Sequence, residues 1–148
     1  MTYKSTKTFQ PLSCAFRQHG AKSHCRLIHG YGLQITVEFS AHKLDRLNWV
    51  IDFGGLGELR SDFEVMFDHT YIAASDDPEL PMLQTMATRG LISLRVFNEV
   101  SCERFAEWCM RQTRAWLKSC RLTSRVWVSR VEVREHSGNA ATVIGEEP

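Results

Sequence analysis

A cysteine four residues before a His-Gly-aromatic turn is the first place in this sequence where side-chain chemistry is expected. Cys25 lies within the run from Ser23 to Tyr31, and its His-Gly-Tyr turn leads directly into a strand pattern. A thiol becomes a good nucleophile when a neighbouring base or cation stabilises its thiolate. The plainer interpretation is a polar turn around a buried thiol, and this stretch alone leaves both interpretations open.

Two further positions carry groups suited to proton transfer or to heterocycle binding. His69 follows Asp68, and an imidazole oriented by a carboxylate can donate or accept a proton. Glu135 ends the last predicted strand, where its carboxylate can accept two parallel hydrogen bonds from an amidine-like edge. Each also has an ordinary explanation, which is a helix cap with a surface histidine for the first and a solvated strand end for the second.

Hydrophobic periodicity indicates the elements that hold these residues in the first half of the chain. Apolar and polar residues alternate strictly over 33–39, which predicts a half-buried strand. A weaker strand pattern covers 8–16, with Pro11 near its centre. Apolar residues recur at three- and four-residue steps over 56–67, which predicts an amphipathic helix ending just before Asp68.

The second half of the chain adds a strand, a helix and a closing strand. Alternation returns over 91–97, and a helix follows over 101–118 with Ser101 as its N-cap. The last strand covers 123–135, and its apolar positions change parity, which predicts a bulge near Ser129. Such a bulge would re-aim the side chain of Glu135.

These elements predict an α+β fold in one domain over residues 1–136. We expect an antiparallel sheet of about four strands, covered on one face by two helices. Residues 137–148 are small and polar, and we expect them to form a flexible tail.

Composition and charge exclude several classes of protein. The net charge is +1 with acids and bases interleaved, which gives no reason to expect nucleic acid or a membrane surface as a partner. No apolar run approaches the roughly 20 residues that span a bilayer, and the N-terminus lacks the apolar segment of a signal peptide. Five cysteines without a Cys-x-x-Cys pair argue against a disulfide framework. We therefore expect a cytoplasmic protein.

Five short motifs, taken in order, carry a family resemblance. The motifs are the Cys…Leu-Ile-His-Gly-Tyr run over 25–31, Asp-Phe-Gly over 52–54, Phe-Asp-His over 67–69, Val-Ser-Cys-Glu-Arg over 100–104 and Val-Glu-Val-Arg-Glu over 131–135. With them the chain resembles the 6-pyruvoyl-tetrahydropterin synthase and 6-carboxy-tetrahydropterin synthase (QueD) family of tunnelling-fold enzymes. The resemblance runs from about residue 12 to residue 135.

The resemblance implies a role for each candidate residue. Cys25 would be the catalytic thiolate, and Asp68 and His69 would handle protons. Glu135 would hold the 2-amino and N3–H edge of a pterin, and Ser101 would stand in for a threonine that contacts the pterin. The implied function is that of a carbon–oxygen lyase acting on a dihydroneopterin triphosphate-type heterocycle, in tetrahydropterin or 7-deazaguanine (queuosine precursor) metabolism.

The resemblance also implies an oligomer. In this family sheets join edge to edge into a barrel, as a ring or hexamer, and the active sites lie at subunit interfaces. Edge-to-edge pairing also removes the exposed strand edges of a small open sheet.

The zinc site that the family implies is degenerate in this sequence. Family members bind zinc through three histidines, of which only His29 remains, because Phe16 and Tyr31 occupy the other two positions. A catalytic zinc requires three protein ligands, so we expect zinc to be absent or weakly bound. A site rebuilt from His19, His24 and His29 is the alternative, although their spacing does not follow the strand parity of the lost position.

Two functions therefore stay open. The first is an enzyme acting on a pterin- or purine-like molecule. The second is a zinc-less, non-catalytic paralogue that serves as a ligand-binding or assembly module, in which the side chains of Phe16 and Tyr31 would fill the emptied zinc cavity.

Overall fold

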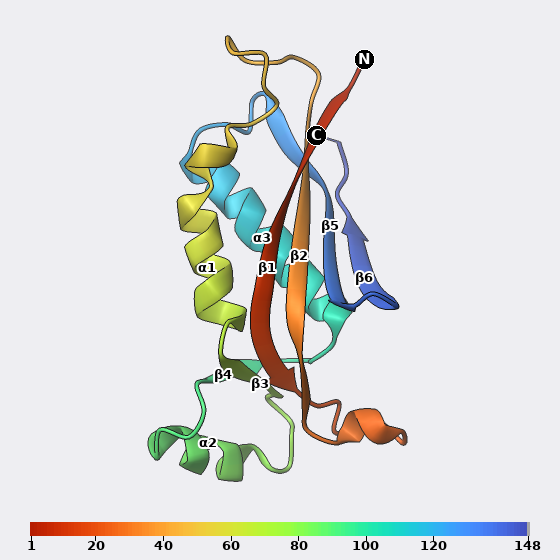
Figure 1. Ribbon diagram of the computed structural model, residues 1–148, viewed down its shortest axis with the longest axis vertical. Helices are drawn as coiled ribbons and strands as arrows, with labels where there is room; N and C mark the ends of the chain where they lie inside the picture. Colours follow the sequence, from red (N-terminus) through yellow and green to blue (C-terminus); the bar gives the residue numbers. More distant parts are fainter. Residues whose placement is uncertain (148) are drawn as a thin grey trace.

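A curled sheet, built around one long hairpin, organises the molecule. The computed structural model describes residues 1–147. The sheet has six strands in the order β4-β3-β1-β2-β5-β6 (Figure 1). The strands are β1 (Tyr3–Phe16), β2 (His29–Ala41), β3 (Thr70–Ala74), β4 (Leu94–Phe97), β5 (Val126–His136) and β6 (Asn139–Ile144). β1, β2, β5 and β6 pair antiparallel, whereas β3 and β4 add parallel pairs beside the last residues of β1, so the sheet is mixed.

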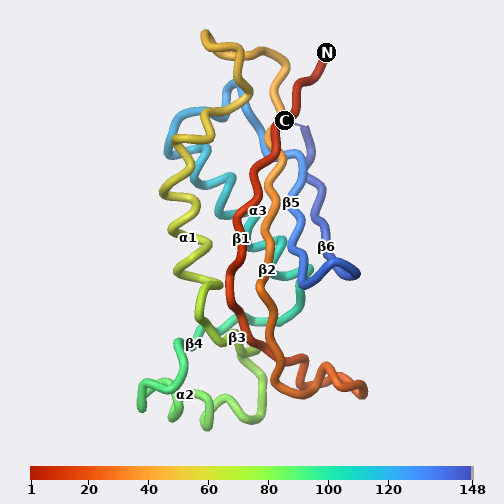
Figure 2. Tube along the Cα trace, viewed as in Figure 1, coloured from red at the N-terminus to blue at the C-terminus, as the bar shows by residue number. Residues whose placement is uncertain are grey.

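Two of the three α-helices in the described part of the chain cover one face of this sheet. α1 (Gly57–Phe67) and α3 (Cys102–Ser119) pack on the central strands, and α2 (Leu80–Thr88) lies beyond the β3–β4 end (Figures 1 and 2). Short 3-10 turns span His24–Arg26 and Phe53–Gly55. Of the helices described, none is long and apolar enough to cross a membrane.

The core lies between the sheet and the two helices α1 and α3. Leu33, Ile35, Val37 and Phe39 are all fully buried, while Gln34 on the opposite face is exposed. Aromatic rings complete the packing from the helix side, for example Phe9 against Phe63 with ring centroids 5.1 Å apart. Burial of this apolar face is the main stabilising contribution to the fold.

Several predictions from the sequence are confirmed. The helices expected at 56–67 and 101–118 correspond to α1 and α3, and the Ser101 side chain caps α3 by accepting from the N–H of Arg104. The bulge near Ser129 is present, because Glu38 pairs with Arg130 and the next residue of β2 pairs with Val128.

Other predictions are wrong. The sheet has six strands rather than about four and is mixed rather than antiparallel, and the described residues hold a third helix, α2. β3 escaped the periodicity analysis because all five of its residues are buried, so it shows no alternation. Residues 139–144, which were expected to belong to a flexible tail, form β6 instead, because β5 supplies a hydrogen-bonding edge for this polar segment.

Candidate functional site

A pocket of about 560 Å³ lies where one end of the sheet meets the start of α3. The end of β1 with its following loop, the start of β2, residues 100–103 and the β5–β6 hairpin all contribute to its wall. Four of the predicted site residues line this pocket together, namely Cys25, His29, Ser101 and Glu135. The chain thus gathers a thiol, an imidazole, a hydroxyl and a carboxylate from segments far apart in the sequence.

Hydrogen bonds on both sides of Cys25 hold the turn that carries it. The Ser23 side chain accepts a hydrogen bond from the Cys25 N–H (3.4 Å), and the Cys25 carbonyl accepts one from the Gln18 N–H (2.9 Å). The Gln18 side chain in turn donates to the Val100 carbonyl (2.8 Å), just before α3 begins. Cys25 is a free, half-buried cysteine that lines the pocket.

Glu135 contacts the first residue of α3 in the pocket wall. The Cys102 thiol donates to Oε1 of Glu135 at 3.2 Å. Burial and the neighbouring Glu135 carboxylate raise the pKa of the Cys102 thiol well above its usual range, so this sulfur keeps its proton and acts as a donor. Cys102 was not among the predicted site residues. The only sequence signal was a cysteine within the helix-opening motif.

The three positions at which the resemblance implies zinc ligands, Phe16, His29 and Tyr31, lie side by side on the face of the hairpin that meets the core. Phe16 pairs with His29 across β1 and β2, and the ring centroids lie 5.0 Å apart. Tyr31 contacts both rings, at 6.0 Å from Phe16 and 5.5 Å from His29. Burial and the nearby Glu135 charge raise the pKa of the Tyr31 hydroxyl.

This set of side chains does not fit a zinc ion with three protein ligands. A phenyl ring has no donor atom, so of these three side chains only the His29 imidazole offers a nitrogen ligand. His19, considered as a replacement ligand, contacts Asp76 at 3.1 Å instead. Within residues 1–147, no three histidine, cysteine or carboxylate side chains gather as a metal site would require.

Asp68 and His69 lie away from this pocket. Asp68 ends α1, and its carboxylate accepts the Ser13 N–H (2.9 Å), which holds the pKa of Asp68 below its usual range. His69 lies 3.1 Å from Asp68, has a left-handed φ of 56° and is 84% exposed. Neither Asp68 nor His69 is among the described residues that line the Glu135 pocket. The pair instead faces solvent beside the edge of β1 that turns away from β2.

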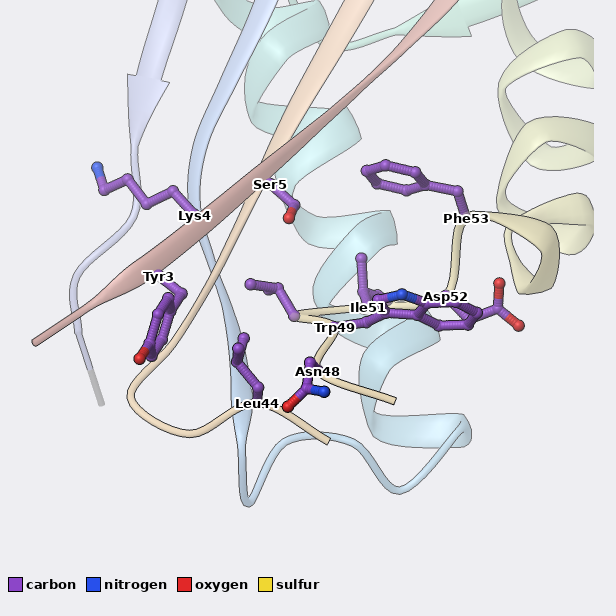
Figure 3. Close-up of a pocket in the computed structure, with 10 residues that line it drawn as sticks. Tyr3, Lys4, Ser5, Leu44, Asn48, Trp49, Ile51, Asp52 and Phe53 are labelled. Atoms are coloured by element: carbon purple, nitrogen blue, oxygen red, sulfur yellow. The ribbon is translucent and has the colours of Figure 1, made fainter. Parts of the chain in front are cut away.

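A second pocket, of about 520 Å³, lies at the far end of the hairpin. Figure 3 shows the rings of Tyr3, Trp49 and Phe53 around the aliphatic side chains of Leu44 and Ile51. Its only charged lining residues are Lys4 and Asp52, and Asp52 already accepts the Gly54 N–H. The pocket that holds Cys25 and Glu135 is therefore the better candidate for chemistry.

Comparison with known families identifies the chain. The model of the 6-pyruvoyl tetrahydropterin synthase family matches residues 5–146. The chain belongs to this family. The resemblance inferred from the five motifs is thus confirmed.

The curated relatives of this family member match part of its length. A 6-carboxy-5,6,7,8-tetrahydropterin synthase of Rickettsia typhi is 36% identical over 62 residues, which cover 41% of this chain and 45% of the relative. The Rickettsia conorii enzyme of the same name is 33% identical over 60 residues, which cover 40% and 44%. These matches span less than half of each relative.

Solved structures extend the similarity in fold to nearly the whole chain. An uncharacterized protein from Wolinella succinogenes superposes with a TM-score of 0.85 at 22% identity, covering 99% of both chains. The 6-pyruvoyltetrahydropterin synthase of Plasmodium vivax gives 0.69 at 16% identity, covering 97% of both chains. That of Caenorhabditis elegans gives 0.62 at 16% identity, covering 99% of this chain and 96% of the other.

Proposed function

We propose that this chain is a 6-carboxytetrahydropterin synthase-like protein that binds a pterin-type heterocycle in the Glu135 pocket. Its place would be in tetrahydropterin or 7-deazaguanine metabolism. The observation that carries the proposal is that Glu135 and Cys25 line one pocket, in a member of the 6-pyruvoyl tetrahydropterin synthase family. A pocket of about 560 Å³ is also within the usual size range for small-molecule sites.

Glu135 would recognise the heterocycle. A carboxylate has two oxygens in one plane, which match the paired N–H groups of an amidine edge such as that of a pterin. The Cys102 thiol, at 3.2 Å from Oε1, orients the carboxylate and leaves further lone pairs on both oxygens for the ligand. Ser101 lines the same pocket, and its hydroxyl proton is free to turn toward a ligand while the oxygen caps α3.

Cys25 would serve the chemical step as a lyase thiolate. Its half-buried position in the pocket wall supports this role, in which the sulfur would remove or return a proton at the substrate side chain. The proton-handling pair, Asp68 and His69, would then have to come from a neighbouring copy, because within one chain this pair lies outside the pocket wall.

A ring of subunits would supply that pair. Within residues 1–147, β1 pairs with β3 only through 14–16, which leaves its edge over 3–12 open, and β6 is the outer strand at the other side of the sheet. Pairing of β6 with the open β1 edge of the next copy would remove both edges. It would also bring Asp68 and His69, which lie beside β1, toward the hairpin residues 138–140 that line the next pocket.

Ligand binding by Glu135→Gln tests the proposal. The substitution keeps the shape of the side chain but removes its charge. A hydrogen bond to a charged group contributes about 1.5–3 kcal/mol, whereas one between neutral groups contributes about 0.5–1.5 kcal/mol. We expect the affinity for neopterin, measured by calorimetry, to fall at least about tenfold with the oligomeric state unchanged. Glu58→Gln, on the exposed face of α1, is the matched control. Equal neopterin affinity in wild type and Glu135→Gln would refute the proposal.

A second candidate function is a non-catalytic ligand-binding or assembly module. The observation that favours it is the aromatic pair of Phe16 and Tyr31 at two zinc positions. Incubation with 7,8-dihydroneopterin triphosphate separates the two candidates. Turnover that disappears in Cys25→Ala supports the enzyme, and neopterin binding without any turnover supports the module.

A further inference from the structure

We propose that Phe16, His29 and Tyr31 form a metal-independent wall of the Glu135 pocket, and that the chain binds its planar heterocycle without zinc. This inference rests on the proposed function and specifies how the same pocket works. We call these three residues the aromatic wall. It replaces a metal centre by ring packing, and it makes ligand binding insensitive to metal removal.

The first argument is the anchoring of Phe16 in the core. Its side chain is 5% exposed, and its ring meets the ring of Phe105 on α3 edge to face, with centroids 5.2 Å apart. This contact holds the phenyl ring in place from the helix side. A metal ion at this position would have to displace a buried ring that offers it no ligand atom.

The second argument is the continuity of the ring packing. The three centroid distances within the aromatic wall lie between 5.0 and 6.0 Å, and Tyr31 also contacts His136 on β5 at 5.7 Å. These spacings fall within the range of about 4.5–7 Å that favourable aromatic pairs adopt. The rings therefore link β1, β2 and β5 in the region where the family holds its ion.

The third argument is the position of the wall relative to the pocket. Phe16 and His29 line the same pocket as Glu135, with Tyr31 behind them. A planar heterocycle held at its amidine edge by Glu135 can then contact aromatic surface and gain dispersion energy. The ligand is then a flat, amidine-bearing heteroaromatic ring whose binding needs no metal ion.

Calorimetry with and without metal tests the inference on wild-type protein purified without a histidine tag. Neopterin is titrated in the presence of EDTA and, separately, with equimolar zinc. Affinities that agree within about threefold support the metal-independent wall. A gain of tenfold or more with zinc would overturn it and leave the proposed function intact. If neopterin binds under neither condition, the proposed function itself fails, and this inference fails with it.

A variant designed to bind zinc tests whether Phe16 and Tyr31 are the reason that zinc is excluded. Phe16→His with Tyr31→His would place three imidazoles together, and we expect about one zinc per chain by elemental analysis, as in a three-ligand site. The control carries Tyr3→His and Val65→His, two exposed positions that lie apart in the fold. Tyr31→His alone, at a half-buried position, serves if the double variant is unfolded, and we expect it to bind zinc at least tenfold more tightly than wild type. A folded variant that binds no more zinc than wild type would overturn the inference.

Discussion

Asp77→Asn is the perturbation that best tests how the fold supports the Cys25 turn. Asp77 lies between β3 and α2, and its side chain is 1% exposed. Arg17, which directly follows β1, donates through Nε to Oδ2 (2.8 Å) and through Nη2 to Oδ1, while the Glu79 N–H donates to Oδ1 (2.9 Å). Nη1 of Arg17 also lies 3.5 Å from the Arg26 carbonyl, so the ion pair connects the sheet with the Cys25 turn.

The magnitude follows from the burial of this pair. Removing one partner of a buried ion pair costs about 3–5 kcal/mol, because the other charge is left unpaired. Arg17 keeps 20% of its side chain exposed, so water can partly compensate and we take the lower end, about 3 kcal/mol. Replacing both residues by apolar ones removes both charges, so Arg17→Met with Asp77→Leu should be less destabilised than the sum of its single variants.

Urea unfolding followed by tryptophan fluorescence measures the effect. The Arg17 guanidinium holds the pKa of Asp77 below its usual range. The stabilisation is therefore present above the unfolded-state pKa of Asp, about 3.9, and is lost as the pH falls through the lower pKa of the folded state. The free energy of unfolding of Asp77→Asn should thus fall less steeply on acidification than that of wild type.

The neighbouring Asp76→Asn provides the control. Its side chain is 75% exposed and contacts the half-buried His19, so we expect a cost below about 0.5 kcal/mol. The reasoning that Arg17 and Asp77 stabilise the fold as an ion pair would be refuted by either of two results. One is a loss of unfolding free energy under about 1 kcal/mol in Asp77→Asn, and the other is full additivity in the double variant.

Two further predictions concern the thiols. Iodoacetamide at pH 8, read by mass spectrometry, should modify Cys25 and Cys120 and spare the three buried cysteines, whose pKa values burial raises; equal labelling of all five cysteines would contradict the packing described. Cys102→Ala should weaken neopterin binding by about two- to tenfold, because it removes one hydrogen bond of about 0.5–1.5 kcal/mol that orients Glu135. An unchanged affinity, with the fold intact by circular dichroism, would show that this thiol does not orient the carboxylate.

The sequence predicted the elements that have one buried and one open face. β2 alternates strictly because Leu33 and Ile35 meet the core while Gln34 faces outward. β3 and β6 could not be found in the same way. All residues of β3 are buried, and β6 depends on pairing with β5, which is a tertiary contact that no local pattern reports.

The site was predictable only as far as a family pattern reaches. The motifs singled out Cys25, Ser101 and Glu135, and the structure shows that all three line one pocket. The motifs could not indicate that the Asp68 carboxylate accepts a hydrogen bond from the Ser13 N–H at a strand edge. A linear motif does not say whether its residues meet within one chain or between two copies. Cys102 was missed because a cysteine in the first turn of a helix is more often a small buried residue than a partner for a carboxylate.

Phenylalanine at position 16, where the family resemblance implies a zinc-binding histidine, links the fold to the proposed function. A histidine at position 16 would bring two ring nitrogens into a buried position, where each needs a metal or a hydrogen-bond partner. Phe16 removes that requirement and packs directly on Phe105 of α3. At position 16 the end of the hairpin is therefore stabilised by ring packing. It follows that chelation should leave the melting temperature of this chain unchanged, whereas a family member with a bound zinc would lose the stabilisation that a ligand gives to the folded state.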